Sequence, residues 1–371
     1  DEFAVLLSGV DSDEANEQAH RLLAAIRRPV CLEDVNLFVT ASVGIALVPD
    51  HGTDTNLLLQ HADVAMYVAK AASSGVEIYR PDDALASHRR LVLAGDLTAA
   101  VEEHTFEVWY QPQGDAATGR IVGAEALLRW EHPTYGPVSP PEAVALAERT
   151  GVLRRLTNTI LEDALRQRAA WSALGHEVNI SVNITPLDLS DTGLPDVVSG
   201  LLDATGTPAG ALTLEITESG VMSDPARCLA VLDVLAAQGV RLSVDDFGIG
   251  HSSLAYLERL PVDEVKIDKS FVMRLEREVS DAKVVRATVA LAHDLGLLVV
   301  AEGVESQVAW MRVAQLGCEF VQGYALARPM PGIETIGWMN NWAATGVGTP
   351  THVESGSPGR PPTSQTPELM P

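Results

Sequence analysis

Polar side chains stand at the carboxyl ends of several apolar, strand-like runs in this sequence. A strand that is flanked by helices is usually apolar throughout, so a carboxylate or an amide at its end is unfavourable unless a ligand binds it. The repetition of this feature along one stretch of the chain predicts a single convergent site for cations. The residues at these strand ends are Glu125, Asn183, Glu215, Asp245, Asp246, Lys266, Glu302 and Gln322.

The candidate ligands are oxygen donors, with no histidine or cysteine among them, and such a set suits hard cations such as Mg²⁺ or Mn²⁺. The carboxylates exceed what one divalent ion needs, which predicts two ions bridged by Asp245. Two ions about 4 Å apart are a recurrent device for phosphodiester hydrolysis, because they activate water and stabilise the entering and leaving oxygens.

Each of these residues alone also has a purely structural explanation. A single strand-end acid can be a helix cap or an ion-pair partner, and Asn183 can cap a turn. The adjacent pair Asp245 and Asp246 is harder to explain in this way, because like charges repel unless a cation is present. Lys266, alone in an apolar strand, is either a structural counter-ion or a catalytic group that orients the attacking water.

The elements that would position these residues alternate between strands and helices over residues 105–342. Eight strands with helical segments between most of them predict an α/β fold, a TIM-like (β/α)8 barrel whose strand ends gather at one mouth. Only the short turn GDAATGR separates the first two strands, so we expect the first strand to be antiparallel, because a parallel crossover needs a dozen or more residues. The expected strands lie near 106–113, 121–130, 177–184, 211–217, 240–247, 262–268, 297–303 and 320–328.

Residues 1–80 precede the barrel as a partial α+β domain that is small for an independent core. Residues 81–104 are expected to form a helical linker into the barrel, and residues 343–371, rich in Pro, Gly, Ser and Thr, a disordered tail. The sequence opens without a methionine inside a strand-like segment, so we expect a longer polypeptide with regions upstream. Within the first domain, strands are expected at 1–7, 37–48 and 76–80, and helices at 12–27 and 55–72.

The bulk composition restricts the partners. A net charge of −24 over 371 residues argues against a general nucleic-acid-binding surface, although metal ions and a few basic residues could still admit an anionic substrate. Cys31, Cys228 and Cys318 lack metal-ligand spacing and are expected to be buried thiols in a reducing compartment. The absence of a long apolar run predicts no membrane segment in this chain and a cytoplasmic location, while an upstream region could anchor a full-length protein in a membrane.

The ordered motifs of residues 100–335 resemble those of the EAL-domain cyclic-di-GMP phosphodiesterases. This resemblance implies hydrolysis of cyclic-di-GMP to linear 5′-pGpG with two Mg²⁺ or Mn²⁺ ions, in a homodimer that could be controlled by upstream sensor domains. The motifs are YQPQ (110–113), EALLRW (125–130), RWEHPTYGPVSP (129–140), SVNIT (181–185), LEITES (214–219), DDFGIGHSSL (245–254), PVDEVKIDKSF (261–271), AEGVES (301–306) and GCEFVQGYALARP (317–329).

The resemblance also implies roles for individual residues. Lys266 would assist the attacking water, with Glu125 and Asp245 as the other catalytic residues. Glu218 would anchor the loop after its strand, and Glu305 would lie at the edge of the site. The implied metal ligands are Glu125, Asn183, Glu215, Asp245, Asp246 and Glu302, and the implied substrate contacts are Gln111, Arg129 and Gln322.

Two residues depart from the family pattern in the loop after Asp246. Ile249 stands where the family usually has threonine, and His251 where it usually has tyrosine. In the family this loop is thought to couple dimerisation to metal binding. Loss of a hydroxyl there could weaken hydrogen bonding by about 1 kcal/mol, which bears on regulation and dimer geometry more than on chemistry.

The first 80 residues resemble the carboxyl-terminal half of a GGDEF diguanylate cyclase domain. The resemblance is carried by DEF (1–3), SVGIALVPDHGTD (42–54) and ADVAMYVAK (62–70). The half of that domain that would carry GTP binding is not in this sequence, and Asp1 alone cannot make cyclic-di-GMP. We therefore expect no cyclase activity from this chain.

Two other functions compete with hydrolysis. A non-catalytic cyclic-di-GMP receptor would share the fold, but degenerate members of such families lose metal ligands that this chain keeps. A barrel enzyme acting on a sugar phosphate would carry a Gly-rich phosphate site after the last two strands. The segments AEGVES and QGYALARP show no clear site of that kind.

Overall fold

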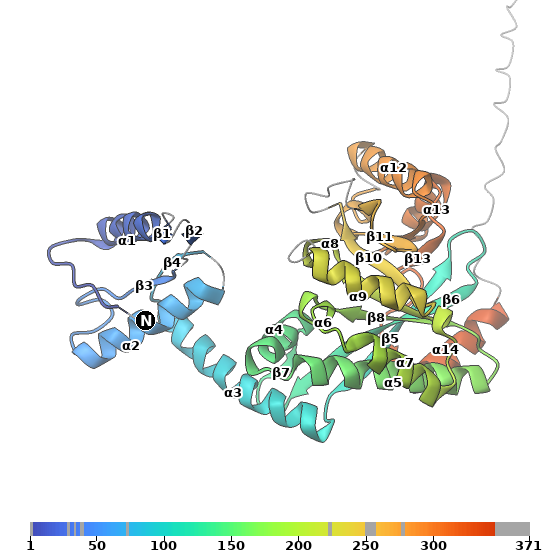
Figure 1. Ribbon diagram of the computed structural model, residues 1–371, viewed down its shortest axis with the longest axis horizontal. Helices are drawn as coiled ribbons and strands as arrows, with labels where there is room; N and C mark the ends of the chain where they lie inside the picture. The colour runs from blue at the N-terminus through green and yellow to red at the C-terminus, as the bar shows by residue number, and fades with distance from the viewer. Residues whose placement is uncertain are drawn as a thin grey trace, which may run out of the picture. The chain divides into compact units, whose positions relative to one another are not determined.

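The chain forms two compact units in a computed structural model (Figure 1). One unit comprises Asp1–Thr105 with Glu131–Val152, and the other comprises Phe106–Trp130 with Leu153–Pro371. The boundaries expected from the sequence for the domains and the linker stay a prediction. The structure describes residues 3–27, 30–32, 35–37, 41–71, 74–221, 225–248, 257–275 and 279–345.

The second unit is built on a closed barrel of eight strands. Strand β5 pairs antiparallel with both β6 and β13, whereas the neighbours from β6 through β8 to β13 pair in parallel, which confirms the barrel with a reversed first strand. In order around the barrel the strands are β5 (Glu107–Asp115), β13 (Phe320–Gln322), β12 (Leu298–Ala301), β11 (Glu264–Ile267), β10 (Arg241–Phe247), β9 (Leu212–Thr217), β8 (Asn179–Ile184) and β6 (Ile121–His132).

Helices cover the outside of this barrel (Figure 1). The short strand β14 (Met330–Pro331) adds antiparallel to β5. The helices are α5 (Leu153–Ala173), α6 (Pro186–Leu189), α7 (Leu194–Thr205), the 3-10 turn η1 (Ala209–Ala211), α8 (Glu218–Val221), α9 (Pro225–Ala237), α11 (Lys269–Val272), α12 (Val279–Asp294), α13 (Gln307–Leu316) and α14 (Gly332–Thr345).

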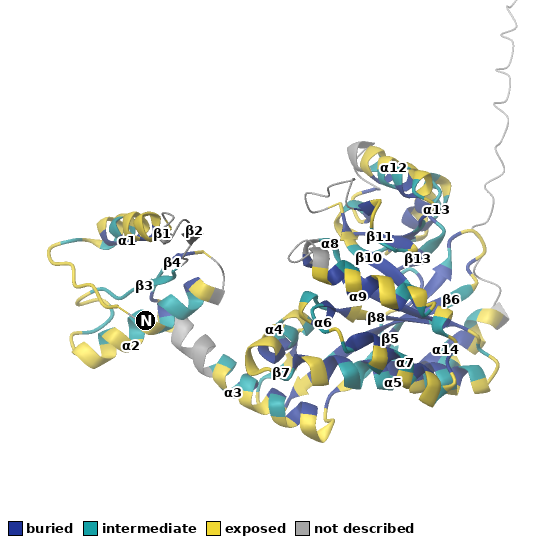
Figure 2. Ribbon diagram, in the orientation of Figure 1, coloured by how far each residue is buried: buried dark blue, intermediate teal, exposed yellow. Residues whose placement is uncertain are grey.

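The apolar core lies between the strands and this layer of helices, as the dark blue strands of Figure 2 show. On β9, Leu214 and Ile216 pack in the same cluster as Leu232 and Leu235 of α9. Because side chains alternate along a strand, Glu215 between the two apolar residues faces the interior of the barrel. The helix layer therefore fixes which residues of each strand reach the site.

The amino-terminal unit holds two small sheets. Strands β1 (Val30–Leu32) and β2 (Val35–Leu37) pair antiparallel, and β3 (Val43–Ile45) and β4 (Val76–Ile78) pair in parallel. Helix α1 (Ser12–Ile26) begins with a capping box between Asp11 and Glu14 and packs Ala19 and Leu23 against Val76. The unit also contains α2 (Thr55–Ala71), α3 (Pro81–Glu103), β7 (Gly136–Val138) and α4 (Pro140–Thr150), with an ion pair from Arg89 of α3 to Glu142 of α4.

Three strand predictions were wrong in whole or in part. The strand expected at 1–7 is absent over its described residues, where Phe3 and Leu6 are almost fully exposed, because an extended segment is stable only when another strand pairs with it. The strand expected at 37–48 is divided, because its described parts pair with different strands: Leu37 belongs to β2, which pairs with β1, and Val43–Ile45 forms β3, which pairs with the three-residue β4. The strand expected at 320–328 ends at Gln322, because Gly323 turns the chain with a φ of +154°.

Other expectations fall partly outside the described residues. Helix α14 extends to Thr345, and the rest of the tail expected to be disordered is not described. Cys228 and Cys318 are buried as expected, whereas the side chain of Cys31 is not described. Over the described ranges, no helix has both the length and the apolar character that crossing a bilayer requires.

The close approach of Gly323 to the Val304 backbone can be tested by substitution. A Cβ at this position would lie 2.3 Å from both the backbone nitrogen and the oxygen of Val304, so Gly323→Ala should lower the free energy of unfolding by about 2 kcal/mol or more. Urea unfolding of both proteins measures the difference. Gly337→Ala is the control, because a Cβ there meets no described atom within 4 Å and alanine favours the helix. Equal loss in both variants would contradict this account.

Candidate functional site

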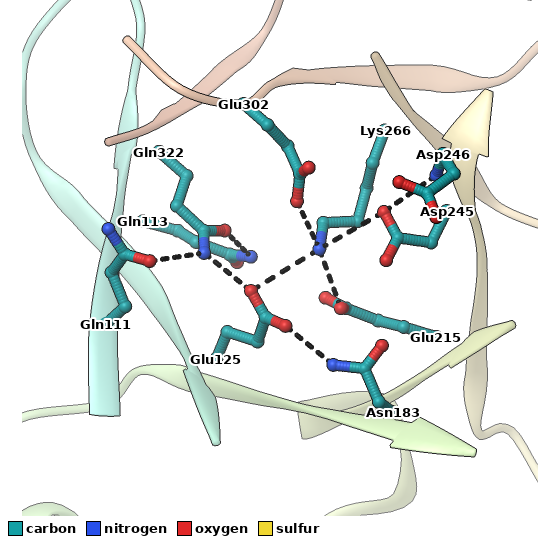
Figure 3. Close-up of polar contacts among 10 residues, drawn as sticks. All are labelled: Gln111, Gln113, Glu125, Asn183, Glu215, Asp245, Asp246, Lys266, Glu302 and Gln322. Atoms are coloured by element: carbon teal, nitrogen blue, oxygen red, sulfur yellow. Dashed lines mark hydrogen bonds and ion pairs between the residues drawn. The ribbon is translucent and has the colours of Figure 1, made fainter. Parts of the chain in front are cut away.

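Lys266 lies at the centre of the side chains that gather at the mouth of the barrel (Figure 3). Its side chain is fully buried, and its Nζ lies 2.7 Å from Glu215 Oε2 and 2.6 Å from Glu302 Oε1. Glu125 Oε2 at 3.4 Å and Asp245 Oδ1 at 3.6 Å complete the ring of acids. The structure therefore brings carboxylates from β6, β9, β10 and the segment after β12 around one ammonium.

The register of the parallel strands explains this convergence. Asn183 of β8 and Glu215 of β9 are direct Cα partners, so their side chains leave the sheet side by side. Burial is graded across the group: Glu215 and Lys266 are fully buried, whereas Asn183 and Asp246 are exposed. The acids thus line a site that is closed at the barrel interior and open at the strand ends.

Asp245 and Asp246 occupy an irregular end of β10. The register between β10 and β11 shifts between Val244 and Phe247, and Asp246 adopts a left-handed backbone conformation with a φ of 56°. The Asp246 backbone N–H donates to Asp245 Oδ1 at 2.9 Å. Such irregularities often aim side chains next to active sites. Here the shift breaks the alternation along the strand, so both neighbouring aspartates can reach the site from adjacent positions.

Amide side chains fix the Glu125 carboxylate from two sides. Asn183 Nδ2 donates to Glu125 Oε1 at 2.6 Å, and Gln322 Nε2 donates to Glu125 Oε2 at 2.5 Å. Gln322 Nε2 also donates to Gln111 Oε1 at 3.1 Å (Figure 3). These bonds join β5, β6, β8 and β13, and they link four of the residues predicted from the sequence in one chain, from Asn183 through Glu125 and Gln322 to Gln111.

The site carries more negative than positive charge. Five carboxylates from the predicted ligand set stand near one ammonium, an excess of four negative charges when all are ionised. Burial opposes the charge of Lys266, but Glu125, Glu215 and Glu302 outweigh it and hold the pKa of Lys266 well above its usual range. Burial also raises the pKa of Glu125, but the charge of Lys266 and the hydrogen bonds from Gln322 and Asn183 lower it by more. The pKa of Glu125 therefore lies below its usual range.

Other acids show the cost of this excess charge. Burial, followed by repulsion from Glu125, raises the pKa of Glu215 well above its usual range. Burial raises the pKa of Glu302 to about 7, against the attraction of Lys266. Burial and the charge of Asp245 raise the pKa of Asp246. Each of these carboxylates would be more favourably ionised if further positive charge lay beside it.

The donor set fits a hard divalent cation. Glu215 Oε1 is buried and, within the part of the chain that the structure describes, has no hydrogen-bond partner, which is an unfavourable state for a carboxylate oxygen. The same described residues include no group of three or more His, Cys, Asp or Glu that is already arranged to hold an ion, because the acids close around the Lys266 ammonium instead. The oxygen-donor chemistry and the unpartnered atom therefore match a cation, although the acids surround a lysine.

Arg129 stands at the carboxyl end of β6 beside the site. Its guanidinium lies 5.6 Å from the centroid of the Trp109 ring, and one of its nitrogens donates to the Leu128 carbonyl. Partial burial lowers the pKa of Arg129, and the charges of Tyr324 and Glu125 oppose that effect. The side chain is thus held by an aromatic ring near the predicted ligands, with guanidinium N–H groups that this contact does not use.

Two predicted residues stand apart from this network, and a third, Gln111, joins it through Gln322. Glu305 is exposed and takes no part in the contacts of Figure 3. Glu218 lies at the start of α8, after β9, and its buried Oε2 has no partner among the described atoms. Gln111 is held from outside the acid ring, since its Nε2 donates to the Ala327 carbonyl at 3.1 Å. Ile249 and His251 lie outside the described residues.

Gln113 belongs to the network, although the sequence did not single it out. Its Nε2 donates to Gln322 Oε1 at 2.8 Å, and both side chains are buried. The signal was present in YQPQ, because residues two apart on a strand face the same side and Gln111 was already a candidate.

Comparisons with known proteins find relatives of both parts of the chain. The family model of the EAL domain matches residues 94–329, and that of the diguanylate cyclase GGDEF domain matches residues 1–75. MucR of Pseudomonas aeruginosa, described as a bifunctional diguanylate cyclase/cyclic di-GMP phosphodiesterase, is 39% identical over 333 residues, which are 89% of this chain and 49% of MucR. The cyclic di-GMP phosphodiesterase NbdA of the same organism is 36% identical over 335 residues, 89% of this chain and 42% of NbdA.

Solved structures share the barrel. A PaMucR phosphodiesterase in complex with c-di-GMP is 42% identical with a TM-score of 0.63, and the match covers 66% of this chain and 99% of that one. The EAL domain of Mycobacterium smegmatis DcpA is 34% identical with a TM-score of 0.55, covering 64% and 98%. This chain spans about half the length of the curated relatives or less. The ordered motifs, the barrel and these matches together show that the chain belongs to the EAL domain family.

Proposed function

We propose that the barrel hydrolyses one phosphodiester bond of cyclic-di-GMP to give linear 5′-pGpG, with the help of two Mg²⁺ or Mn²⁺ ions. The observation that carries this proposal is the ring of carboxylates around the buried Lys266, whose excess negative charge and oxygen-only donors suit divalent cations. The names of the relatives support the substrate, since MucR and NbdA are both described as cyclic di-GMP phosphodiesterases.

The ions would be held at the mouth of the barrel. When bound, such ions polarise the phosphate and lower the pKa of water. Cations would also offset the burial and repulsion that raise the pKa of Glu215 and Glu302, and would provide a partner for Glu215 Oε1. The proposed ligands are Glu125, Asn183, Glu215, Asp245, Asp246 and Glu302.

Lys266 would act on the attacking water. Its surroundings favour the protonated ammonium, which can donate hydrogen bonds to the water and offset the charge of the phosphate. In the reaction, the water oxygen forms a bond to phosphorus, the bond from phosphorus to the 3′ oxygen breaks, and a proton passes to that leaving oxygen. Glu125 and Asp245, both within 3.6 Å of Lys266 Nζ, would contact both this lysine and the ions and so fix their relative positions.

The substrate would meet residues on β5, β6 and β13. Arg129 carries forked N–H donors that suit a phosphate, and its stacking near Trp109 restricts its orientation. Gln111 and Gln322 present amides beside Glu125, where the substrate would approach the acids. Glu218 and Glu305 stay proposals as support for the loop and the edge of the site. A homodimer, upstream sensor domains and a cytoplasmic location stay predictions from the sequence.

The purified chain should convert cyclic-di-GMP to pGpG when Mg²⁺ or Mn²⁺ is supplied, and chelation by EDTA should abolish the conversion. Separation of the nucleotides by liquid chromatography measures both the pGpG formed and the remaining cyclic-di-GMP. A folded sample that binds cyclic-di-GMP tightly by calorimetry but does not hydrolyse it with either ion would contradict catalysis and favour a receptor.

Replacement of Lys266 by methionine should lower kcat by about 100-fold or more, since the site loses its buried ammonium donor. Lys283→Met is the matched control, because Lys283 is exposed on α12 and should leave kcat unchanged. Steady-state hydrolysis of cyclic-di-GMP at saturating Mn²⁺ compares the two. A Lys266→Met protein that stays folded and keeps more than half of the parental kcat would remove Lys266 from the proposed chemistry.

Metal binding should be visible in thermal stability without any substrate. A ligand that binds only the folded protein stabilises it by about 2.7 kcal/mol at 100 times its Kd, so Mn²⁺ should raise the Tm of the parent. Glu215→Gln should reduce that increase, because it removes a buried carboxylate from the proposed ligands. Glu334→Gln, a change at an exposed position of α14, should respond to Mn²⁺ as the parent does. An identical Mn²⁺ response in all three proteins would contradict the assignment of Glu215.

A further inference from the structure

Gln113 of β5 contacts the site through Gln322, and its side chain could orient one of the predicted residues. Its side chain and that of Gln322 are only 7% and 4% exposed, and the bond from Gln113 Nε2 to Gln322 Oε1 measures 2.8 Å. Figure 3 shows the Gln113 amide against that of Gln322, on the side away from Gln111. A buried hydrogen bond of this length between two amides fixes both side chains.

The barrel register sets the path of this side chain. Gln113 on β5 is the Cα partner of Gln322 on β13 and of Gly123 on β6, so the three residues form one row across three strands. A Cβ at Gly123 would lie 3.0 Å from Gln113 Oε1, which is tighter than ordinary contact. The glycine therefore leaves the space in which the Gln113 amide lies beside Gln322.

The hydrogen-bond partners determine which atom of each neighbouring amide is the nitrogen and which is the oxygen. Gln111 Nε2 donates to the Ala327 carbonyl, which can only accept, so Gln111 presents its Oε1 to Gln322. Gln322 Nε2 uses its hydrogens on Gln111 Oε1 and Glu125 Oε2, which are both acceptors. The remaining atom of that amide, Gln322 Oε1, requires a donor, and Gln113 Nε2 provides it.

We propose that Gln113 is a positioning residue, whose side-chain amide holds Gln322 in the orientation that donates to the Glu125 carboxylate. Without this donor, Gln322 keeps a buried oxygen with no partner, and other rotamers of its side chain compete with the one that contacts Glu125. The consequence for catalysis rests on the proposed function, in which Glu125 binds a cation. Residues that orient a metal ligand typically change affinity or activity by 10- to 100-fold when they are replaced.

Gln113→Met removes the donor at nearly constant length. The kcat for cyclic-di-GMP should fall about 10-fold, and calorimetry on the metal-free protein should show Mn²⁺ binding weakened about 10-fold. The matched control is Gln238→Met, since Gln238 is partly buried and its Nε2 donates to the Pro195 carbonyl, outside the site. The control should keep both quantities within twofold. Parental kcat and Mn²⁺ affinity in folded Gln113→Met would overturn the proposal.

A double-mutant cycle separates positioning from a general effect on packing. If Gln113 acts through Gln322, then Gln113→Met should cost nothing further in a Gln322→Met background, and the double variant should match Gln322→Met within twofold in kcat. A further loss as large as that of the single Gln113→Met change would show that Gln113 acts independently of Gln322, and would overturn the proposal.

Gln113→Glu keeps the shape of the side chain and decides the matter where the methionine variant fails to fold. Its carboxylate places an acceptor against Gln322 Oε1, so a crystal structure of the metal-free variant should show Gln322 Nε2 moved out of hydrogen-bond distance of Glu125 Oε2. An unchanged contact would overturn the proposal. If the parent does not hydrolyse cyclic-di-GMP, the proposed function fails, while calorimetry and this structure still decide the role of Gln113.

Discussion

The ammonium of Lys266, buried among carboxylates, is the interaction on which the rest of the site depends. A buried charge is stable only when partners compensate its lost hydration, and Glu215 and Glu302 do so at 2.7 and 2.6 Å. The compensation is more than complete, because Glu125 and Asp245 add further negative charge nearby. One lysine therefore holds together acids that would otherwise repel each other, and it leaves them with unmet capacity for positive charge.

The reversed strand β5 contributes neutral amide side chains to one side of the site. Because β5 lies between β6 and β13, its inward-facing glutamines stand in register with Glu125, Gly123 and Gln322. The parallel strands supply acids at their carboxyl ends, whereas β5 supplies neutral amides that donate and accept hydrogen bonds. The amides can therefore orient the Glu125 carboxylate without adding charge to a site that already has an excess of negative charge.

Much of the barrel and of its acid ring could be predicted from the sequence, because both follow from local patterns. Apolar runs that contain Glu125, Glu215 or Lys266 identify strands, although β6 continues past Glu125 to His132. The failures share a cause, which is that pairing is not local. The apolar segment with Phe3 forms no strand because none pairs with it, and Gly323 ends β13 because of the close approach to Val304. Gln113 was missed because its role depends on partners that are distant in sequence.

The strained end of β10 connects the electrostatics of the site to its geometry. A regular strand would direct Asp245 and Asp246 to opposite faces, with one of them against the helices. The left-handed conformation of Asp246 is uncommon for a residue other than glycine, and it accompanies a shift in register toward β11, the strand of Lys266. Partial burial and the charge of Asp245 raise the pKa of Asp246, as the closeness of the two carboxylates would lead one to expect. A cation bound by both carboxylates would offset the repulsion between them, which is the role proposed for this pair.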